Sequence, residues 1–425
     1  MSTSECIKQL MQHKIVITVG CTEPVAVALA VAKAKEVLGD KVENIDLFLS
    51  KNIIKNAMGV GIPGTGMIGL PIAVALGVVC GESEKGLQVL ENAKDNVDSA
   101  QTWLDTHTIN IQPADVTDKF FIQCIAKSKT SKAEVIIKQQ HTNFVYVAKD
   151  EKVLFEKKCS EECQTCSDDE ILNALNEKII WDYATTEPLD ELEWIEDTVT
   201  LNDRCSQASL EGEYGLQIGK KLFNSWDKSI RNEIIARTCA ASDARMDGIT
   251  LPIYSNSGSG NQGITCTLPV YYYGKKRNAD REQIIRALTL SHLTSIYIKG
   301  KIGCLSALCG VVNASMGAAT GIVYLAGGSF DQACSAIKNM TNTITGMVCD
   351  GAKPSCALKI SAGLNSAFDS VLLAINSIVV SATDGIAEPS IDKTVEDIGK
   401  IGRYGMDAMD DMVLNIMTHK NCKDS

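Results

Sequence analysis

Two cysteines are placed for chemistry in the stretch MVCDGAKPSC, residues 347–356. Cys349 follows an apolar segment with helical character, Gly351 breaks that segment, and Pro354 suits the first position of a following helix. Cys356 then falls in the first turn of that helix, where unpaired backbone N–H groups and the positive end of the helix dipole stabilise a thiolate. We therefore expect two thiolates at facing helix ends.

A third sulfur is available in GKIGCLSALCG, residues 300–310. Cys304 and Cys309 lie about 140° apart if this segment is helical, so only one of them can face a given site. A cup of three thiolates would hold a four-iron cluster and leave one iron without a protein ligand. That iron is a Lewis acid for a substrate carboxylate or for a leaving hydroxyl or thiolate. Spacing alone equally fits buried cysteines in an Ala-rich core.

Two glycine-rich loops and one further thiol offer groups for substrate binding and proton transfer. In YSNSGSGNQGIT, residues 254–265, polar side chains stand beside bare backbone N–H groups, which suits a carboxylate. Polar residues in and before KNAMGVGIPGTG offer the same, although either loop can instead be a structural turn. Cys21, next to Gly20 at a helix start, could act as a thiolate base. The loop candidates are Ser257, Ser259, Asn261, Gln262, Lys51, Asn52, Asn56 and Thr65.

A second cysteine group, CSEECQTC at residues 159–166, has the spacing of radical enzymes that use S-adenosylmethionine. No alternating series of strands and helices follows Cys159, Cys163 and Cys166, so we favour an exposed polar loop. The five histidines are scattered and form no catalytic pattern, and we expect most of them to be structural or on the surface. They are His13, His107, His141, His292 and His419.

The expected elements define an α+β fold: a small amino-terminal α+β portion with an antiparallel ribbon, then a mostly α-helical catalytic domain. Thr22 is the expected N-cap of a helix that ends at Gly39. Four alternating runs over residues 119–157 predict the ribbon, and residues 158–204 look like an acidic connection. We expect a boundary between residues 1–204, which contribute the Cys21 loop, and 205–425. Other expected segments are a strand at 42–50 and helices at 3–13, 70–79, 228–240, 279–297, 304–326, 331–347 and 356–381.

The composition excludes several classes of function. The 425 residues carry a net charge of −11 and no basic stripe, which argues against nucleic acid as a partner. Sixteen cysteines without a secretory signal predict a reducing, cytoplasmic location. Residues 56–81 and 302–330 are uncharged and long enough to span a membrane, but their Gly, Ser, Thr and Asn content favours helices surrounded by protein.

Five motifs carry a resemblance to a known family: GCTEP, KNAMGVGIPGTG, SNSGSGNQG, GKIGCLSALCG and VCDGAKPSCALK, in this order from residue 20 to about residue 360. Together they resemble the L-cysteine desulfidase family, which is related to the α-subunit of bacterial iron–sulfur L-serine dehydratases. The resemblance implies an oxygen-sensitive [4Fe-4S] cluster held by three cysteines. It also implies β-elimination without pyridoxal phosphate, in which L-cysteine and water give sulfide, ammonia and pyruvate.

Carried over by position, the implied cluster ligands are Cys309, Cys349 and Cys356, and the implied proton acceptor is Cys21. Two alternatives stay open, namely Cys21 as a ligand and Cys304 in place of Cys309. In the related dehydratases a carboxy-terminal cysteine can occupy the open iron. Cys422 in the tail NCKDS could therefore bind the open iron and inhibit the enzyme.

These observations predict a cytoplasmic iron–sulfur lyase whose partner is a small amino acid, L-cysteine or L-serine. We expect neither nucleic acid nor a membrane as a partner, and a homo-oligomer stays open. The alternatives are an L-serine dehydratase, a radical enzyme built on the 159–166 cysteines, a non-catalytic iron–sulfur sensor and a membrane protein.

Overall fold

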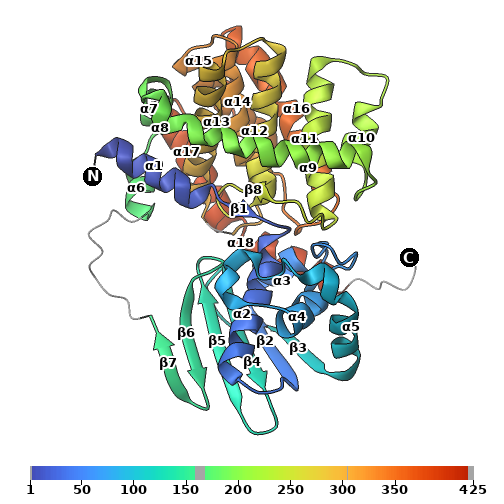
Figure 1. Ribbon diagram of the computed structural model, residues 1–425. Helices are drawn as coiled ribbons and strands as arrows, with labels where there is room; N and C mark the ends of the chain where they lie inside the picture. The colour runs from blue at the N-terminus through green and yellow to red at the C-terminus, as the bar shows by residue number, and fades with distance from the viewer. Residues whose placement is uncertain (1, 158–167, 304, 420–425) are drawn as a thin grey trace.

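The computed structural model describes residues 2–157, 168–303 and 305–419 of the chain. It confirms the predicted α+β class. Figure 1 shows a sheet with its helices in one half and a bundle of helices in the other. The two halves are called the sheet portion and the helical portion below.

The sheet portion is built on six strands in the order β3-β2-β4-β5-β6-β7. The predicted ribbon is confirmed as β4–β7, whereas β3, which runs parallel to β2, was not predicted. Buried residues of β4 lie opposite buried residues of β5, as in the pair Ile122 and Ile137, so the alternation marks one face for the core. The bounds are β2 Asn44–Leu49, β3 Thr108–Pro113, β4 Phe121–Lys127, β5 Lys132–Lys138, β6 Phe144–Lys149 and β7 Lys152–Glu156.

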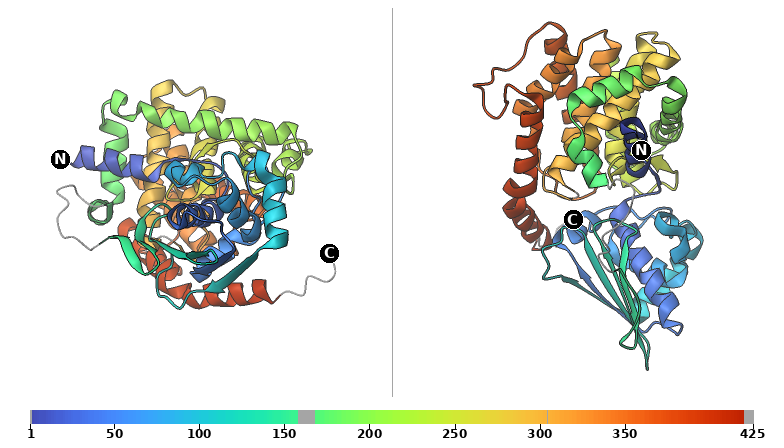
Figure 2. Two further views of the ribbon diagram at one scale, coloured as in Figure 1. Left: turned by 60° about the horizontal axis from the view of Figure 1, so that its bottom comes forward. Right: turned by 90° about the vertical axis from the view of Figure 1, so that its left-hand side faces the viewer.

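Helices cover the apolar face of this sheet, as the right-hand view of Figure 2 shows. The Ala-rich helix α2 is buried along most of its length and packs on β4 and β5. It ends at Gly39, as predicted, with φ of 64°. Its N-cap is Cys21, however, and Thr22 is the first helical residue. The helices are α2 Thr22–Leu38, α3 Lys51–Ala57, α4 Leu70–Val79, η1 Ser83–Gln88, η2 Ala93–Asn96 and α5 Val97–Thr106.

The helical portion surrounds the buried helix α14, Gly310–Leu325. Its small residues let neighbouring backbones approach closely, since a Cβ on Gly317 would lie 2.2 Å from the carbonyl oxygen of Ser291. The other helices here are α9 Asp197–Glu211, α10 Ile218–Phe223, α11 Ile230–Met246, α12 Gly260–Lys276, α13 Arg281–Ile302, α15 Phe330–Ile344, α16 Cys356–Ile375 and α17 Ile391–Lys400, with a π-helical turn at Ile401–Gly405. One described helix, α16, is apolar and long enough to cross a membrane by length and composition.

Two expectations about individual segments were wrong, and one helix was missed. From residue 168 onward the expected acidic connection contains helices that pack into the helical core: α6 Asp168–Ala174, α7 Glu177–Thr186, α8 Leu189–Leu192, η3 Glu193–Glu196 and the start of α9. The helix expected over 304–326 begins only at Gly310, so Cys309 is its N-cap and the helical-wheel argument about Cys304 does not apply. Helix α12, which contains Pro269, was not predicted.

The amino terminus belongs to the helical portion by packing. Helix α1, Thr3–Lys14, contributes Ile7 and Leu10 to the helical core. The short strand β1, Ile17–Thr18, pairs with β8, Ile253–Tyr254, just before α12. The chain then crosses to the sheet portion through Cys21. Because both cores draw on residues from the first half of the chain, the boundary at residue 204 stays a prediction.

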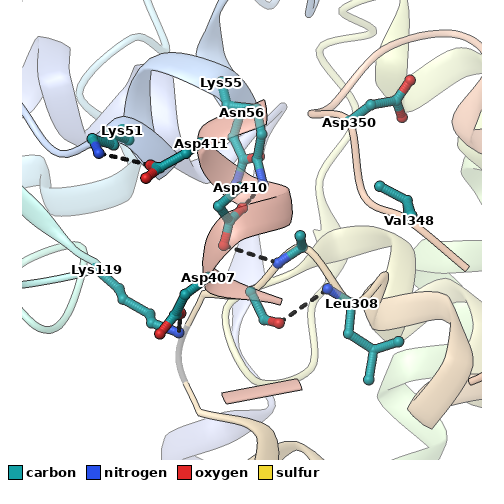
Figure 3. A network of polar contacts seen from close by, with 12 residues as sticks. Lys51, Lys55, Asn56, Lys119, Leu308, Val348, Asp350, Asp407, Asp410 and Asp411 are labelled. Carbon is teal, nitrogen blue, oxygen red and sulfur yellow. Dashed lines mark hydrogen bonds and ion pairs between the residues drawn. The ribbon is translucent and has the colours of Figure 1, made fainter. Parts of the chain in front are cut away.

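The carboxy-terminal helix α18, Asp407–Thr418, ties the two portions together (Figure 3). Asp407 and Asp411 form exposed ion pairs of 2.7 Å with Lys119 and Lys51 of the sheet portion. Between them, Asp410 forms a buried ion pair with Lys55 of α3. The second carboxylate oxygen of Asp410 accepts a hydrogen bond of 3.1 Å from the backbone N–H of Ala307.

Asp410→Ala should lower the free energy of unfolding by about 3–5 kcal/mol, because it leaves the ammonium group of Lys55 buried without a counter-charge. The matched control is Asp411→Ala on the same helix. Its ion pair is exposed, so the loss should stay below about 1 kcal/mol. Urea denaturation of both variants measures the difference. Equal losses of unfolding free energy would contradict the claim that the buried ion pair of Asp410 stabilises the contact between α18 and the sheet portion.

Candidate active site

The amino-terminal ends of four long helices meet where the two portions touch. They are the starts of α2 at Thr22, α12 at Gly260, α14 at Gly310 and α16 at Cys356. The hydroxyl of Thr22 donates a hydrogen bond of 3.0 Å to the carbonyl oxygen of Gly258, just before α12. A Cβ on Gly310 would lie 2.7 Å from the amide nitrogen of Gln262, so the starts of α12 and α14 are also in contact. The positive ends of the helix dipoles make this seam favourable for anions.

Three cysteines come together at this seam. A short antiparallel bridge between Leu308 and Val348 sets Cys309 beside Cys349. The backbone N–H of Cys309 donates to Met347 over 2.9 Å, and that of Cys349 donates to Ala307 over 2.6 Å.

The three thiols interact directly. A hydrogen bond joins the thiols of Cys309 and Cys349; it lowers the pKa of Cys349, assisted by the positive charges of Lys55 and Lys359, and raises the pKa of Cys309. Burial raises the pKa of Cys356, which is close enough for a charge on Cys349 to act on it. The structure thus brings together the three cysteines that the family resemblance implied as ligands.

Charged residues hold the loop that carries Cys349. Lys359 donates to the carbonyl oxygen of Val348 over 2.8 Å and pairs with Asp350. Burial opposes ionisation of Asp350, but hydrogen bonds from Lys353 and Lys359 hold its pKa at about 2. The loop also presses against the sheet portion, since a Cβ on Gly351 would lie 2.2 Å from the carbonyl oxygen of Lys55.

A fourth thiol, that of Cys21, lies beside this group. Cys21, Val60 and Met246 form a small buried cluster against which Cys356 packs. The Cys21 thiol donates a hydrogen bond of 3.0 Å to the carboxylate of Glu23. Burial, followed by the negative charge of Glu23, raises the pKa of the Cys21 thiol.

Glu23 is the buried carboxylate of the site, with 8% of its surface exposed. It accepts further hydrogen bonds of 3.1 Å from Thr22 and from the side-chain amide of Asn56. Burial acts to raise the pKa of Glu23, but the nearby His141 and the hydrogen bonds from the Cys21 thiol and from Asn56 lower it overall. Glu23 therefore stays ionised and accepts the hydrogen bond of the protonated Cys21 thiol.

His141 is a site residue that the sequence did not reveal. It lies in the turn between β5 and β6, and its ring packs edge-on against Phe120 at 4.7 Å. A Cβ on Gly258 would lie 3.0 Å from the ring, so His141 reaches the start of α12. Its Nε2 atom is buried without a hydrogen-bond partner in the described structure, and burial lowers its pKa while Glu23 opposes this effect.

The remaining described histidines have structural or surface surroundings. His292 is buried between Asn256 and Thr267, with 2.9 Å from its Nε2 atom to the Thr267 hydroxyl. His107 stacks on Trp103, and His13 contacts Asp168.

The loop before α12 places two of its four candidates at the seam. Asn261 and Gln262 are buried in the first turn of α12, and Gln262 accepts a hydrogen bond of 2.7 Å from Asn313. Ser259 is the N-cap and accepts from the backbone of Gln262 over 3.4 Å. Ser257 has a φ of 49°, and its hydroxyl donates a hydrogen bond to the side-chain oxygen of Asn256.

The candidates around KNAMGVGIPGTG separate in space. Asn56 is bonded to Glu23, whereas Thr65 closes a turn through the carbonyl oxygen of Ile62. Asn52 is buried, and its Oδ1 atom has no partner among the described residues. Lys51 lies on the surface with Asp411 and is not brought to the cysteines; the motif itself begins at Lys55, whose ammonium group is the buried one. Cys159, Cys163, Cys166, Cys304 and Cys422 lie outside the described residues.

Comparisons with known proteins identify the family of the chain. The family profile described as serine dehydratase alpha chain matches residues 84–415, which include Cys309, Cys349 and Cys356. A UPF0597 protein of Phocaeicola vulgatus is 47% identical over 98% of both chains. UPF0597 proteins of Bacteroides thetaiotaomicron and Clostridium perfringens are 45% and 39% identical, over 97% and 98% of both chains. The chain belongs to the serine dehydratase alpha chain family.

Proposed function

We propose that this protein is an iron–sulfur lyase that splits L-cysteine into sulfide, ammonia and pyruvate. The observation that carries the proposal is the meeting of Cys309, Cys349 and Cys356 at helix amino termini, beside the buried thiol of Cys21. Membership of the serine dehydratase alpha chain family supports a lyase reaction. We also propose a cytoplasmic location, which the sixteen cysteines of the sequence support.

Cys309, Cys349 and Cys356 supply three thiols, the donor set that a four-iron cluster with one open iron requires. Within residues 2–157, 168–303 and 305–419, no group of three or more His, Cys, Asp or Glu side chains is arranged to hold one metal ion. Cys309, Cys349 and Cys356 are the residues that would hold such a cluster, each binding a different iron. Such a cluster supplies a Lewis-acidic iron that can accept a carboxylate or a leaving sulfur.

The chain's own residues provide for proton removal. In the reacting state Cys21 is a thiolate that has lost its proton to solvent, and it accepts the Cα proton of the substrate. Glu23 accepts the hydrogen bond of the Cys21 thiol over 3.0 Å and so orients its sulfur. The electron pair of the Cα–H bond forms a Cα=Cβ bond while the Cβ–S bond breaks and releases sulfide. The resulting aminoacrylate reacts with water to give pyruvate and ammonia.

The surroundings lower the cost of negative charge at Cα. A carboxylate already makes carbanion formation difficult, and the amino-terminal ends of α2, α12, α14 and α16 offset that charge. Since the site lies at the seam between the two portions, both must be docked for these groups to act together.

L-serine is the second candidate substrate, because the matched family is described by serine dehydratase. The same proton transfer would expel hydroxide in place of sulfide. Comparing kcat/KM for L-cysteine and L-serine separates the two activities, and we expect L-cysteine to be preferred.

Cys349→Ala should remove both the iron and the activity, because the Cys349 thiol interacts with those of Cys309 and Cys356 and is one of the three proposed ligands. Turnover of L-cysteine should fall below about one hundredth of wild type. Anaerobic iron and labile-sulfide analysis measures the cluster. The control is Cys124→Ala, which removes a buried thiol of β4 and should keep the iron. An active Cys349→Ala variant without iron would contradict the proposal.

Cys21→Ala should separate chemistry from cluster binding. If Cys21 is the proton acceptor, the variant keeps its iron while kcat falls about 10²- to 10⁴-fold. Loss of iron together with activity would instead identify Cys21 as a ligand. Iron content and single-turnover release of sulfide, measured on the same preparation, distinguish these results.

A further inference from the structure

The structure buries two arginines among its described residues, and they differ in their surroundings. Arg286 is 9% exposed, and its guanidinium has polar partners. It forms an ion pair with Glu282 and donates hydrogen bonds to the carbonyl oxygens of Ala184 and Glu187. Arg245, in the last turn of α11, is 3% exposed and forms no ion pair with any described residue. Its Nε atom is buried without a hydrogen-bond partner.

The contacts of Arg245 are to neutral groups. One terminal nitrogen donates to the side-chain oxygen of Asn261 over 3.2 Å and lies 3.9 Å from the sulfur of Met246. Burying a guanidinium among neutral partners is unfavourable, because their hydrogen bonds compensate only part of the free energy lost when the charge leaves water. The arrangement therefore calls for an anion that the chain itself does not provide.

The position of Arg245 is built into the start of α12. A Cβ on Gly260 would lie 2.1 Å from the Nε atom of Arg245, so glycine at this position makes room for the guanidinium. Gly260 opens the helix, where backbone N–H groups lack intrahelical partners. The guanidinium of Arg245, the side-chain amide of Asn261 and the N–H groups of the first turn of α12 therefore lie close together.

Arg245 also lies near the reacting groups. Its positive charge acts on the Cys21 thiol and tends to lower its pKa, against the larger effect of burial. Asn261, which it contacts, is followed by Gln262, whose side chain reaches the start of α14 beside Cys309. An anion held by Arg245 would therefore lie near the proton acceptor Cys21 and near the start of α12, which contacts the start of α14.

We propose that Arg245, with Asn261 and the first turn of α12, binds the α-carboxylate of the amino-acid substrate. The assignment rests on the proposed function for the identity of the ligand. A guanidinium can donate two parallel hydrogen bonds to a carboxylate, which a lysine cannot reproduce. Binding the carboxylate here orients the adjacent Cα toward Cys21, so Arg245 is a substrate-binding residue.

The test compares L-alanine, which keeps the carboxylate and amine but has no leaving group, with L-alaninamide, whose carboxylate is an amide. Isothermal titration calorimetry on the anaerobically prepared full chain measures both affinities without turnover. Wild type should prefer L-alanine by at least about tenfold, and Arg245→Gln should reduce the preference to less than about twofold. A folded Arg245→Gln variant that keeps the full preference, or a wild type that shows none, would overturn the assignment.

Two lysine variants control for folding. Arg245→Lys keeps the charge but loses the paired hydrogen bonds, so the preference should fall by about threefold or more. Arg286→Lys changes the other buried arginine and should leave the preference at the wild-type level. If Arg245→Gln does not fold, an unchanged preference in Arg245→Lys overturns the proposal.

The outcomes separate this inference from the proposed function. A wild type that binds L-alanine through Arg245 but turns over neither L-cysteine nor L-serine supports the carboxylate site and contradicts the lyase. Turnover of L-cysteine, together with an unchanged preference in Arg245→Gln, contradicts the carboxylate site and leaves the lyase standing.

Discussion

The meeting of helix amino termini and positively charged side chains at one seam is the constraint on which the rest of the structure depends. Four helices direct their amino termini to this place, and Lys55, Lys359 and Arg245 add buried or half-buried charge. Asp410 and Asp350 balance the two lysines. No described carboxylate balances Arg245, so the seam is suited to thiolates and to an anionic substrate.

The seam exists only while the sheet portion and the helical portion are docked. Cys21, Glu23 and His141 come from one side, and the three clustered cysteines come from the other. The backbones are in close contact at Gly351, and α18 spans the junction with the buried pair of Asp410. Interactions that stabilise the fold at this junction therefore also assemble the groups needed for chemistry.

Local patterns in the sequence predicted much of this arrangement. Alternation revealed β4–β7, and Gly39 marked the end of α2. The turn residues between Cys349 and Cys356 indicated that Cys349 follows one helix and that Cys356 lies in the first turn of the next, and Cys356 is indeed the first residue of α16. Such features depend on neighbours in the chain, and for that reason they can be recognised from spacing.

Other features could not be predicted because they depend on contacts distant in the chain. His141 belongs to an ordinary polar turn, and only the docking of the ribbon brings it to Glu23 and Gly258. Helix α12 carries glycines and Pro269, which weaken the helical pattern, yet tertiary packing imposes a helix there. Arg245 lies in the last turn of the Ala-rich helix α11. Only the three-dimensional structure reveals that its side chain is buried and that its Nε atom has no hydrogen-bond partner.

The central claim is that Cys309, Cys349 and Cys356 hold a four-iron cluster at which an amino acid is split. Anaerobic purification of the full chain, followed by iron and acid-labile sulfide analysis and assays with L-cysteine and L-serine, tests it most directly. The account predicts about four iron and four sulfide per chain and release of sulfide and pyruvate from L-cysteine. A protein that holds no iron after anaerobic reconstitution, yet turns over either amino acid, would contradict it.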